Sequence, residues 1–308
     1  MGIKNFSQFL KKNGHKIKEL KLSDEHKNIT IAADASIMIH QVSSSMKYTN
    51  LTDSKGNDTT AINAILQKIV NLIVKFGAPN IVWIFDSKIP HRLKLNELKK
   101  RKKNKERSIK KLQDKKTEDK KYKEKLKKIN FKITDKLLTD IKTLLTMLCV
   151  TIVDSPDGYD AEHYAACLNK RGLIDYFITT DTDYLVFGGN GMLVPIKKKK
   201  NLYNVFNHFD ILKALEINND ELITCSVMLG SDYAPKAKGI GPATVKKKVD
   251  IYSPTSEQKE AIELFKEDCY YNESINLKNK KINKELLIKW LLDKNFNEKR
   301  VLKIMSLI

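Results

Sequence analysis

Three aspartates in this 308-residue chain directly follow short, largely apolar runs. They are Asp34, Asp86 and Asp181, and Asp183 stands two residues after the last of them. A single aspartate at a strand end commonly caps the turn or helix that follows. If the runs are parallel strands, however, their carboxyl ends meet at one edge of the sheet, where α/β proteins bind ligands. Carboxylates gathered there repel one another unless cations bridge them, so the pattern predicts a metal site.

The ligand chemistry of such a site favours Mg²⁺, which prefers hard oxygen ligands and keeps several waters. Two such ions about 4 Å apart can generate a hydroxide and stabilise the leaving oxygen of a phosphodiester. Neither histidine nor cysteine is required, and the four cysteines are far apart with no Cys-x-x-Cys pair. The residues alone therefore predict a site for Mg²⁺, for which Mn²⁺ can substitute.

Buried strands and amphipathic helices must position these acids. Nearly continuous apolar runs, typical of buried parallel strands, cover residues 28–33, 81–85, 150–153 and 176–180. Apolar residues at helical spacing predict helices over residues 60–76, 135–148 and 161–169. After residue 205 the pattern is helical to the end, with a loop-like stretch around 250–280. The alternation predicts an α/β fold with a twisted, mainly parallel sheet flanked by helices.

Two further acids, Asp160 and Glu162, follow the turn Pro156-Asp157-Gly158. In a continuous helix, residues i and i+2 do not share a face, so these carboxylates can converge only where a helix starts. The alternative interpretation is an ordinary acidic first turn, which is favourable to the helix dipole.

A glycine-rich segment near residue 240 could bind phosphate. Gly239-Ile240-Gly241 could open a helix and present backbone N–H groups to a phosphate, although such a pair is more often only a tight turn. Lys246, Lys247 and Lys248 follow one turn later and favour a contact with a nucleic-acid backbone.

The positive charge of the chain is concentrated in one segment. The net charge is +20, and the segment from His91 to Lys128 holds 19 Lys/Arg and 6 Asp/Glu, a surplus of 13. A polyanion is the usual partner of so basic a protein, although an AT-rich genome also enriches lysine. Interspersed leucines predict one or two helices over 91–135, against the alternative of a disordered basic linker.

Membrane and secretory classes are not expected for this chain. No apolar run approaches the ~20 residues that a membrane span needs. The N-terminal segment becomes polar within a few residues, unlike a secretory signal. We expect an intracellular protein.

The residues carry a resemblance to the flap endonuclease (XPG-type) family of structure-specific nucleases. The matching motifs occur in order and span most of the chain. They are Met1-Gly2-Ile3, Asp34-Ala35-Ser36, Phe85-Asp86-Ser87-Lys88, Asp160-Ala161-Glu162, Asp181-Thr182-Asp183, Phe187-Gly188, Leu229-Gly230-Ser231-Asp232-Tyr233 and Gly239-Ile240-Gly241-Pro242.

The resemblance implies a complete site and a domain plan. It implies two metal ions held by seven acids: Asp34, Asp86, Asp160, Glu162, Asp181, Asp183 and Asp232. It also implies that Lys94 and Arg101 position the scissile phosphate and that Gly2 lies near the site. A single nuclease domain, 1–308, would comprise an N-terminal core (1–90), a helical arch (91–135), an internal core (136–228), a DNA-gripping helix–two-turn–helix (229–250) and C-terminal helices (251–308).

Several residues depart from the family pattern. Asp160 replaces the usual Glu and reaches one methylene less far. His40 stands where a Tyr commonly stacks on a base; on the residues alone, a surface histidine is an equal alternative. Lys236 stands where a Ser often binds a monovalent cation at the helix–two-turn–helix, which argues against that ion here. The chain has no sliding-clamp motif, so no clamp partner is expected.

Together with the acids, the resemblance implies a metal-dependent nuclease that cleaves DNA carrying a 5′ flap or 5′ end, in DNA replication and repair. It would act where DNA is replicated, in a nucleus or, for a virus or prokaryote, in the cytoplasm. Gly2, His40, Gly239, Gly241, Lys246 and Lys247 are the predicted DNA contacts, and we expect a monomer. The alternatives are a gap- or junction-directed nuclease of the same family, an RNA-directed nuclease and a non-catalytic junction-binding protein. Retention of the core acids argues against the last.

Overall fold

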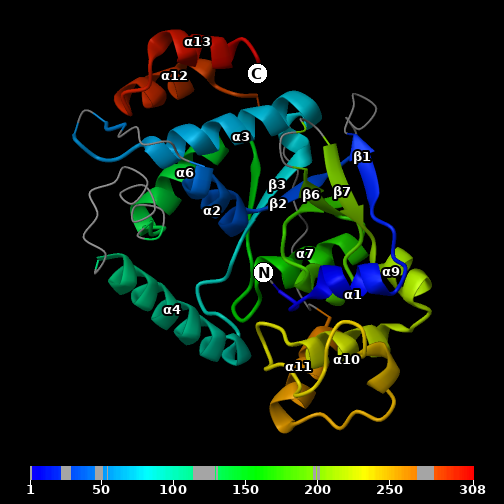
Figure 1. Ribbon diagram of the computed structural model, residues 1–308. Coiled ribbons are helices and arrows are strands. Elements are labelled where there is room, and N and C mark those ends of the chain that lie inside the picture. Colours follow the sequence, from blue (N-terminus) through cyan, green and yellow to red (C-terminus); the bar gives the residue numbers. More distant parts are fainter. Residues whose placement is uncertain are drawn as a thin grey trace. The chain divides into compact units, whose positions relative to one another are not determined.

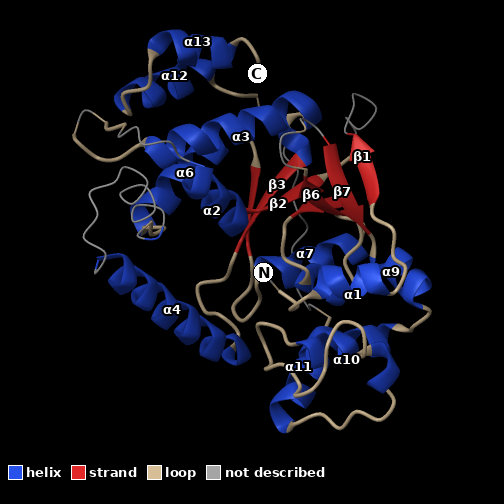
Figure 2. Ribbon diagram, in the orientation of Figure 1, coloured by secondary structure: helices blue, strands red, loops and turns tan. Residues whose placement is uncertain are grey.

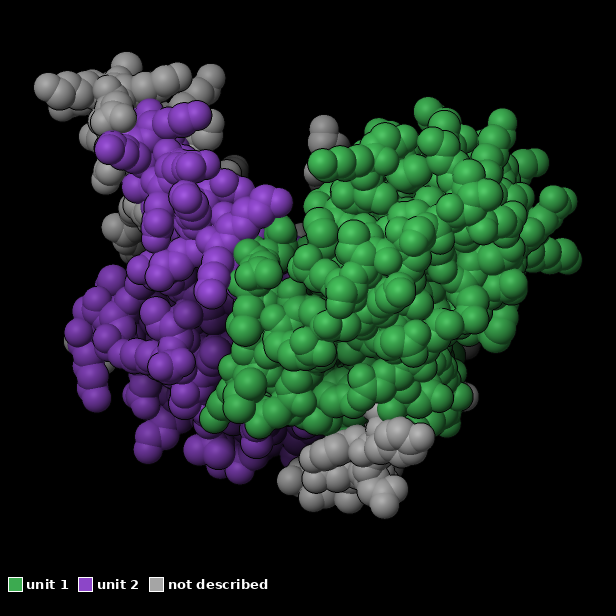
Figure 3. Space-filling view, turned by 90° about the horizontal axis from the view of Figure 1, so that it is seen from below, with its two compact units in different colours: residues 1–34, 84–97, 154–275 green, residues 35–83, 98–153, 276–308 purple. Residues whose placement is uncertain are grey.

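A computed structural model of the chain describes residues 2–21, 29–45, 51–53, 55–113, 129, 131–196, 199, 202–268 and 281–308. The chain divides into two compact units, coloured separately in Figure 3. Unit 1 comprises residues 1–34, 84–97 and 154–275, and unit 2 comprises residues 35–83, 98–153 and 276–308. All seven predicted acids and Lys94 belong to unit 1, whereas His40 and Arg101 belong to unit 2.

The strands form a seven-stranded sheet of order β1-β7-β6-β5-β2-β3-β4 (Figures 1 and 2). Their bounds are β1 Lys18–Lys21, β2 Ile31–Asp34, β3 Ile81–Phe85, β4 Thr151–Asp154, β5 Tyr176–Ile178, β6 Met192–Pro195 and β7 Leu202–Phe206. β2, β5 and β6 pair in parallel, and β7 joins β6 and β1 antiparallel. The four predicted strands are all present, and the predicted mainly parallel sheet is confirmed.

Buried parallel strands explain why the sequence runs were so apolar. All residues of β2 and β3 are buried, so both faces of these strands need apolar side chains. β1 is mostly exposed and β7 half-buried, and both lie on the antiparallel side of the sheet. Their mixed composition gave no strand signal, and sequence reasoning did not predict them or β6.

Unit 1 contains α-helices and two short 3₁₀ turns in addition to its strands. They are α1 Phe6–Lys12, α7 Ala161–Lys170, α8 Asp183–Val186, α9 His208–Leu215, α10 Asn219–Leu229 and α11 Ser256–Lys266, with the 3₁₀ turns η3 Arg92–Lys94 and η4 Lys246–Lys248. α7 packs against β2 and α8, and α10 packs beside α11 (Figure 1). Capping boxes begin α10 at Asn218 and α11 at Thr255, which satisfies backbone donors at both helix starts.

Unit 2 is built mainly of helices. They are α2 Ala35–Ser45, α3 Thr60–Phe76, α4 Leu95–Gln113, α6 Asp135–Met147, α12 Lys284–Asp293 and α13 Glu298–Met305, with the 3₁₀ turn η2 Ala78–Asn80. α4 begins in the last residues of unit 1. α3 has the bounds that its periodicity predicted and ends at Gly77, whose φ of +77° suits glycine. α3 packs against α2 and α6, and α12 packs against α13 and α6.

Two expectations about the later elements need correction. The loop predicted around 250–280 is wrong for residues 256–266, which form α11. The segment after Gly239-Ile240-Gly241 forms turns and the 3₁₀ helix η4 rather than an α-helix. The β-branched Thr244, Val245 and Val249 disfavour a regular helix there.

In the part of the chain that the structure describes, most of the predicted arch is the 3₁₀ turn η3 and the helix α4. α4 covers residues 95–113, and its charged side chains are mostly exposed. Residues 114–128, the remainder of the basic segment, lie outside the described residues. Among the described residues, no helix is long and apolar enough to cross a membrane.

Candidate metal and nucleic-acid site

Strand ends and helix starts of unit 1 carry the seven acids. Asp34 ends β2, and Asp86 directly follows β3. Asp160 is the N-cap of α7, Glu162 lies in its first turn, and Asp183 is the first residue of α8. Asp181 follows β5 by three residues, and Asp232 follows α10 by three. Asp86 is exposed and the other six are buried.

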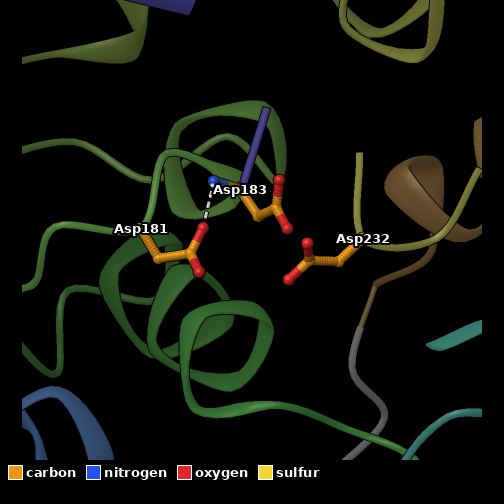
Figure 4. Close-up of side chains that lie close together, drawn as sticks. All are labelled: Asp181, Asp183 and Asp232. Carbon is orange, nitrogen blue, oxygen red and sulfur yellow. Dashed lines mark hydrogen bonds between the residues drawn. The ribbon is translucent and has the colours of Figure 1, made fainter. Parts of the chain in front are cut away.

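Asp181, Asp183 and Asp232 form the tightest acidic group. Each offers a carboxylate oxygen, and these oxygens all lie within 4.8 Å of one another (Figure 4). The Asp183 N–H donates to Oδ1 of Asp181 at 3.2 Å. Oδ1 of Asp183 is buried and has no hydrogen-bond partner among the described residues. Because a buried, unpartnered carboxylate oxygen is energetically costly, this donor set fits a hard divalent cation.

The electrostatics of the cluster lead to the same conclusion. Burial, and then the charges of Asp181 and Asp34, raise the pKa of Glu162 well above its usual range. Burial, followed by Asp181 and Asp232, likewise raises the pKa of Asp183. Burial is also the largest cause of the raised pKa of Asp181. The protein alone therefore disfavours full ionisation of these carboxylates, which a bound cation would favour.

Short polar contacts hold the loops that carry the acids. The Thr179 hydroxyl donates to Oδ2 of Asp34 at 3.1 Å, and the same hydroxyl oxygen accepts the Asp181 N–H at 3.1 Å. The Ala161 N–H donates to Oδ1 of Asp86 at 3.0 Å, which joins the end of β3 to the start of α7. The fold thus fixes acids that lie far apart in sequence.

Lys94 lies against the acidic cluster. Its Nζ donates to Oδ2 of Asp160 at 2.7 Å, and the Tyr233 hydroxyl donates to the same oxygen at 2.5 Å. Burial would lower the pKa of the Lys94 ammonium, but the carboxylates of Glu162 and Asp160 outweigh it, and the net shift is upward. Lys94 is therefore a fixed positive charge beside the acids.

The N-terminal segment packs against the loop that contains Asp181. Gly2 is buried with a φ of +82°, and a Cβ added there would collide with Oδ1 of Asp181. The Ile3 N–H donates to the Thr182 hydroxyl at 2.9 Å. Only glycine fits this close approach without strain, which gives the predicted proximity of Gly2 to the acids a physical basis.

Two predicted residues lie in unit 2. His40 is exposed on α2, and its ring makes an edge contact with Phe131 at 6.4 Å between centroids. Arg101 lies half-buried in α4. The structure assigns these residues no place relative to the acids of unit 1.

The predicted duplex-binding residues lie between α10 and α11. Gly239 has a φ of +69°. The Gly241 N–H donates to the Thr244 hydroxyl at 3.2 Å, so this donor already has a partner inside the turn. Lys246 is half-buried and Lys247 exposed in η4. The exposed lysine supports the idea of a backbone contact, whereas the Gly241 amide is less available than the sequence indicated.

Sequence reasoning assigned no role to three residues that the structure places at the acids. Thr179 and Thr182 flank Asp181 and hydrogen-bond to Asp34 and to the N-terminal segment. Tyr233 hydrogen-bonds to Asp160. The available signal was their position next to predicted acids, in Thr179-Thr180-Asp181-Thr182 and Asp232-Tyr233.

Comparison with known proteins gives matches along most of the chain. The XPG N-terminal domain matches residues 1–108, and the XPG I-region matches residues 149–232. Flap endonuclease 1 of Aedes aegypti is 31% identical, over 98% of this chain and 84% of that protein. Flap endonuclease 1 of Methanococcus aeolicus is 30% identical, over 90% of this chain and 87% of that protein.

Solved structures share the fold. Flap endonuclease-1 from Methanococcus jannaschii aligns with a TM-score of 0.69 at 21% identity, covering 96% of both chains. The catalytic core of Rad2 in complex with DNA substrate aligns with a TM-score of 0.70 at 17% identity, covering 100% of both chains. The sequence matches go beyond this shared fold because they cover both the XPG N-terminal domain and the XPG I-region: the chain is a nuclease, a hydrolase of phosphodiester bonds, and it belongs to the XPG-type flap endonuclease family.

Proposed function

We propose that the chain is a divalent-metal-dependent endonuclease and 5′-to-3′ exonuclease that cleaves DNA at 5′ flaps during replication and repair. The observation that carries the proposal is the buried group Asp181, Asp183 and Asp232 with its unpartnered Oδ1 of Asp183. The relatives from Methanococcus aeolicus and Aedes aegypti, which are 30% and 31% identical, are named flap endonuclease 1, and this supports the substrate. We infer that it acts as a monomer inside the cell, at the site of DNA replication.

The acids around this group would hold two Mg²⁺ ions, and Mn²⁺ could replace them. Asp181, Asp183 and Asp232 would bind directly, because their oxygens already converge. The site would be completed by Glu162, Asp34 and Asp86, because, besides burial and Asp181, the charges of Asp34 and Asp86 raise the pKa of Glu162. When bound, the ions would supply an activated water and neutralise charge on the leaving oxygen.

The chain's own residues would bind and orient the DNA. The fixed charge of Lys94 would attract the scissile phosphate and offset the negative charge that develops on it. Arg101 would assist it when DNA is bound. Gly2 would keep the Asp181 loop in place, and the segment 239–248 would grip the duplex, with His40 stacking on a base.

Removal of two acids tests the proposal. We expect the double variant Asp181→Ala and Asp183→Ala to lose cleavage of a 5′-flap substrate in Mg²⁺, by about 10³-fold or more, while DNA binding changes less than about threefold. Cleavage of end-labelled flap, gap, nick, fork and four-way DNA, with Mg²⁺ or with EDTA, measures activity and substrate preference together.

A matched control is Asp210→Ala, which removes a more exposed aspartate paired with Lys18. This variant should cleave like the unmodified chain. Full activity of the Asp181/Asp183 double variant, or equal cleavage in EDTA, would refute the metal proposal. Preference for gaps or four-way junctions over flaps would instead refute the substrate assignment alone.

A further inference from the structure

We propose that Phe265 and Glu267, at the end of α11, are positioning residues that hold three acid-carrying segments of unit 1 in place. The inference rests on the proposed function, because it concerns how the proposed metal ligands are positioned. α11 lies outside both matched regions, since the XPG N-terminal domain matches residues 1–108 and the XPG I-region residues 149–232. Its contacts with the acid-carrying segments carry the inference.

Three chain segments that carry buried acids also carry an aromatic ring close to those acids. The rings are Tyr159 before Asp160, His163 after Glu162, Phe187 at the end of α8, and Tyr233 after Asp232. The Phe187 N–H donates to the carbonyl of Asp183 at 2.9 Å, so its backbone is joined directly to that acid. A ring so near an acid along the chain helps to fix the backbone on which the acid stands.

The four rings pack against one another. His163 and Phe187 stack with 4.0 Å between ring centroids and an interplanar angle of 7°. Tyr159 lies 4.6 Å from His163, and Phe187 makes an edge contact with Tyr233 at 6.0 Å. Aromatic pairs at such separations prefer defined orientations, so the rings restrain the three segments relative to one another.

Phe265 is the ring that α11 adds to this group. It is 2% exposed, and its centroid lies 4.7 Å from that of Phe187 and 5.5 Å from that of Tyr233. One side chain of α11 therefore contacts both the segment that ends α8 and the segment that carries Asp232. Asp183 and Asp232 belong to these two segments, and a carboxylate oxygen of each lies within 4.8 Å of the other.

Glu267 joins the end of α11 to the third segment. Its Oε1 accepts the Tyr159 hydroxyl at 3.0 Å, and its backbone carbonyl accepts from Nε2 of His163 at 3.3 Å. Tyr159 and His163 flank Asp160 and Glu162, the two acids at the start of α7. Phe265 and Glu267 together therefore contact all three segments.

Such a frame matters because the acids repel one another before a cation binds. Like charges gathered at one place are held there only by the fold around them. A misplacement of about 1 Å at a reacting centre can lower the rate by about 10²-fold. A loosened frame should therefore lower kcat and metal affinity, whereas DNA affinity, which depends mainly on basic residues, should change little.

Glu267 gives the first test, because its side chain is exposed and its loss should not unfold the chain. We expect Glu267→Ala to lower kcat on a 5′-flap substrate by about fivefold with KM within about twofold, because the Tyr159 hydroxyl loses a charged acceptor. Glu267→Gln keeps an oxygen that can accept this bond and should return kcat to within about twofold of the unmodified chain.

The matched control is Asp268→Ala, which removes the next acid along the chain. Asp268 is also exposed, but it pairs with Lys170 at 2.9 Å. The control loses the same charge, and its kcat should stay within about twofold of the unmodified value. Equal kcat for Glu267→Ala and Asp268→Ala would overturn the role of Glu267.

Phe265→Leu gives the second test, because it keeps an apolar side chain but removes the ring. We expect kcat to fall by about tenfold or more and Mn²⁺ affinity, from titration calorimetry, by about threefold or more. Phe296→Leu is the control, since it removes a ring that is 6% exposed in unit 2, and its kcat should stay within about twofold. Both are assayed below their thermal midpoints, and equal kcat for the two would refute the role of Phe265.

Hydrogen exchange of the metal-free protein separates this inference from the proposed function. Phe265→Leu should speed exchange of the amides of residues 164–167 and 185–189 by about tenfold, compared with the same amides in Phe296→Leu. Unchanged exchange there would overturn the inference whatever DNA the chain cleaves. If instead the unmodified chain shows no divalent-metal-dependent cleavage, the proposed function fails, and the exchange rates still decide whether Phe265 restrains these segments.

Discussion

At the scale of single residues, Asp183 carries the strongest physical argument for a bound cation. It is 2% exposed, and its Oδ1 has no hydrogen-bond partner among the described residues. Burial and the charges of Asp181 and Asp232 raise its pKa, so the protein alone disfavours its ionised form. A bound divalent ion would favour that ionised form.

Gly2 offers a residue-scale prediction about the same loop. We expect Gly2→Ala to lower flap cleavage by about tenfold or more, because the added methyl would push the Asp181 carboxylate aside. Gly14→Ala is the matched control, since Gly14 also has a positive φ, of +86°, but open space around it.

Both variants place alanine at a positive φ and therefore strain the backbone. Only the methyl group added by Gly2→Ala would collide with another side chain, that of Asp181. The measurements are the thermal midpoint, the Mn²⁺ dissociation constant and single-turnover cleavage. Equal activity of the two variants would show that the approach of Gly2 to Asp181 has no functional importance.

The sequence alone predicted some residues of the candidate site, and there is a physical reason why it could not predict the others. Asp34, Asp86, Asp181 and Asp183 follow from strand ends, because a local run of apolar residues is enough to locate a strand. Glu162 needed the family resemblance. The contacts of Lys94 and Tyr233 with Asp160 were not predictable, because these residues are 66 and 73 positions away from Asp160 and meet it only through tertiary packing.

At the scale of elements, local pattern decided which predictions succeeded. α3 was predicted to the residue, since nine of its side chains are buried at helical spacing and a glycine ends it. β1 was missed because it is polar and is stabilised by pairing with β7, far away in sequence. α11 was missed within a polar stretch, although its capping box at Thr255 and Gln258 is a local signal.

α3 also carries an unusual charge, which leads to a prediction about stability. Lys68 lies half-buried on it, with Nζ bonded to Oε1 of Gln41 at 3.1 Å, and burial lowers its pKa to about 8. Between pH 8 and 10.5 the unfolded chain binds more protons at this residue than the folded chain does. The contribution of Lys68 to stability therefore rises with pH across that window, and its burial penalty is complete below pH 8.

We expect Lys68→Met to stabilise the fold at pH 7 by ~1–2 kcal/mol, an amount reduced for the partial exposure of the side chain. The gain should shrink as the pH approaches 10.5. Urea unfolding at pH 7 and pH 10 measures it, with exposed Lys213→Met as the control. A gain that is the same at both pH values would show that burial of the charge is not its cause.

At the scale of the whole molecule, the distribution of charge distinguishes the two units. Unit 1 holds the seven acids and Lys94, so its acidic cluster has its own adjacent cation. Most of unit 2's share of the basic segment lies on α4, whose lysines are mostly exposed. With a net charge of +20, the chain should attract DNA over long distances and release counterions on binding.

Salt dependence makes this argument quantitative for the η4 lysines. If Lys246 and Lys247 each contact a phosphate, the double variant Lys246→Ala and Lys247→Ala should reduce the slope of log K against log salt by about 2. The measurement is fluorescence anisotropy of flap DNA in EDTA at several salt concentrations, so that cleavage does not interfere. Lys213→Ala, at an exposed lysine of α9, should leave the slope unchanged. If the double variant binds more weakly but keeps the full slope, the two lysines stabilise the turn rather than neutralise phosphates, and the segment 239–248 would not be the duplex-binding surface.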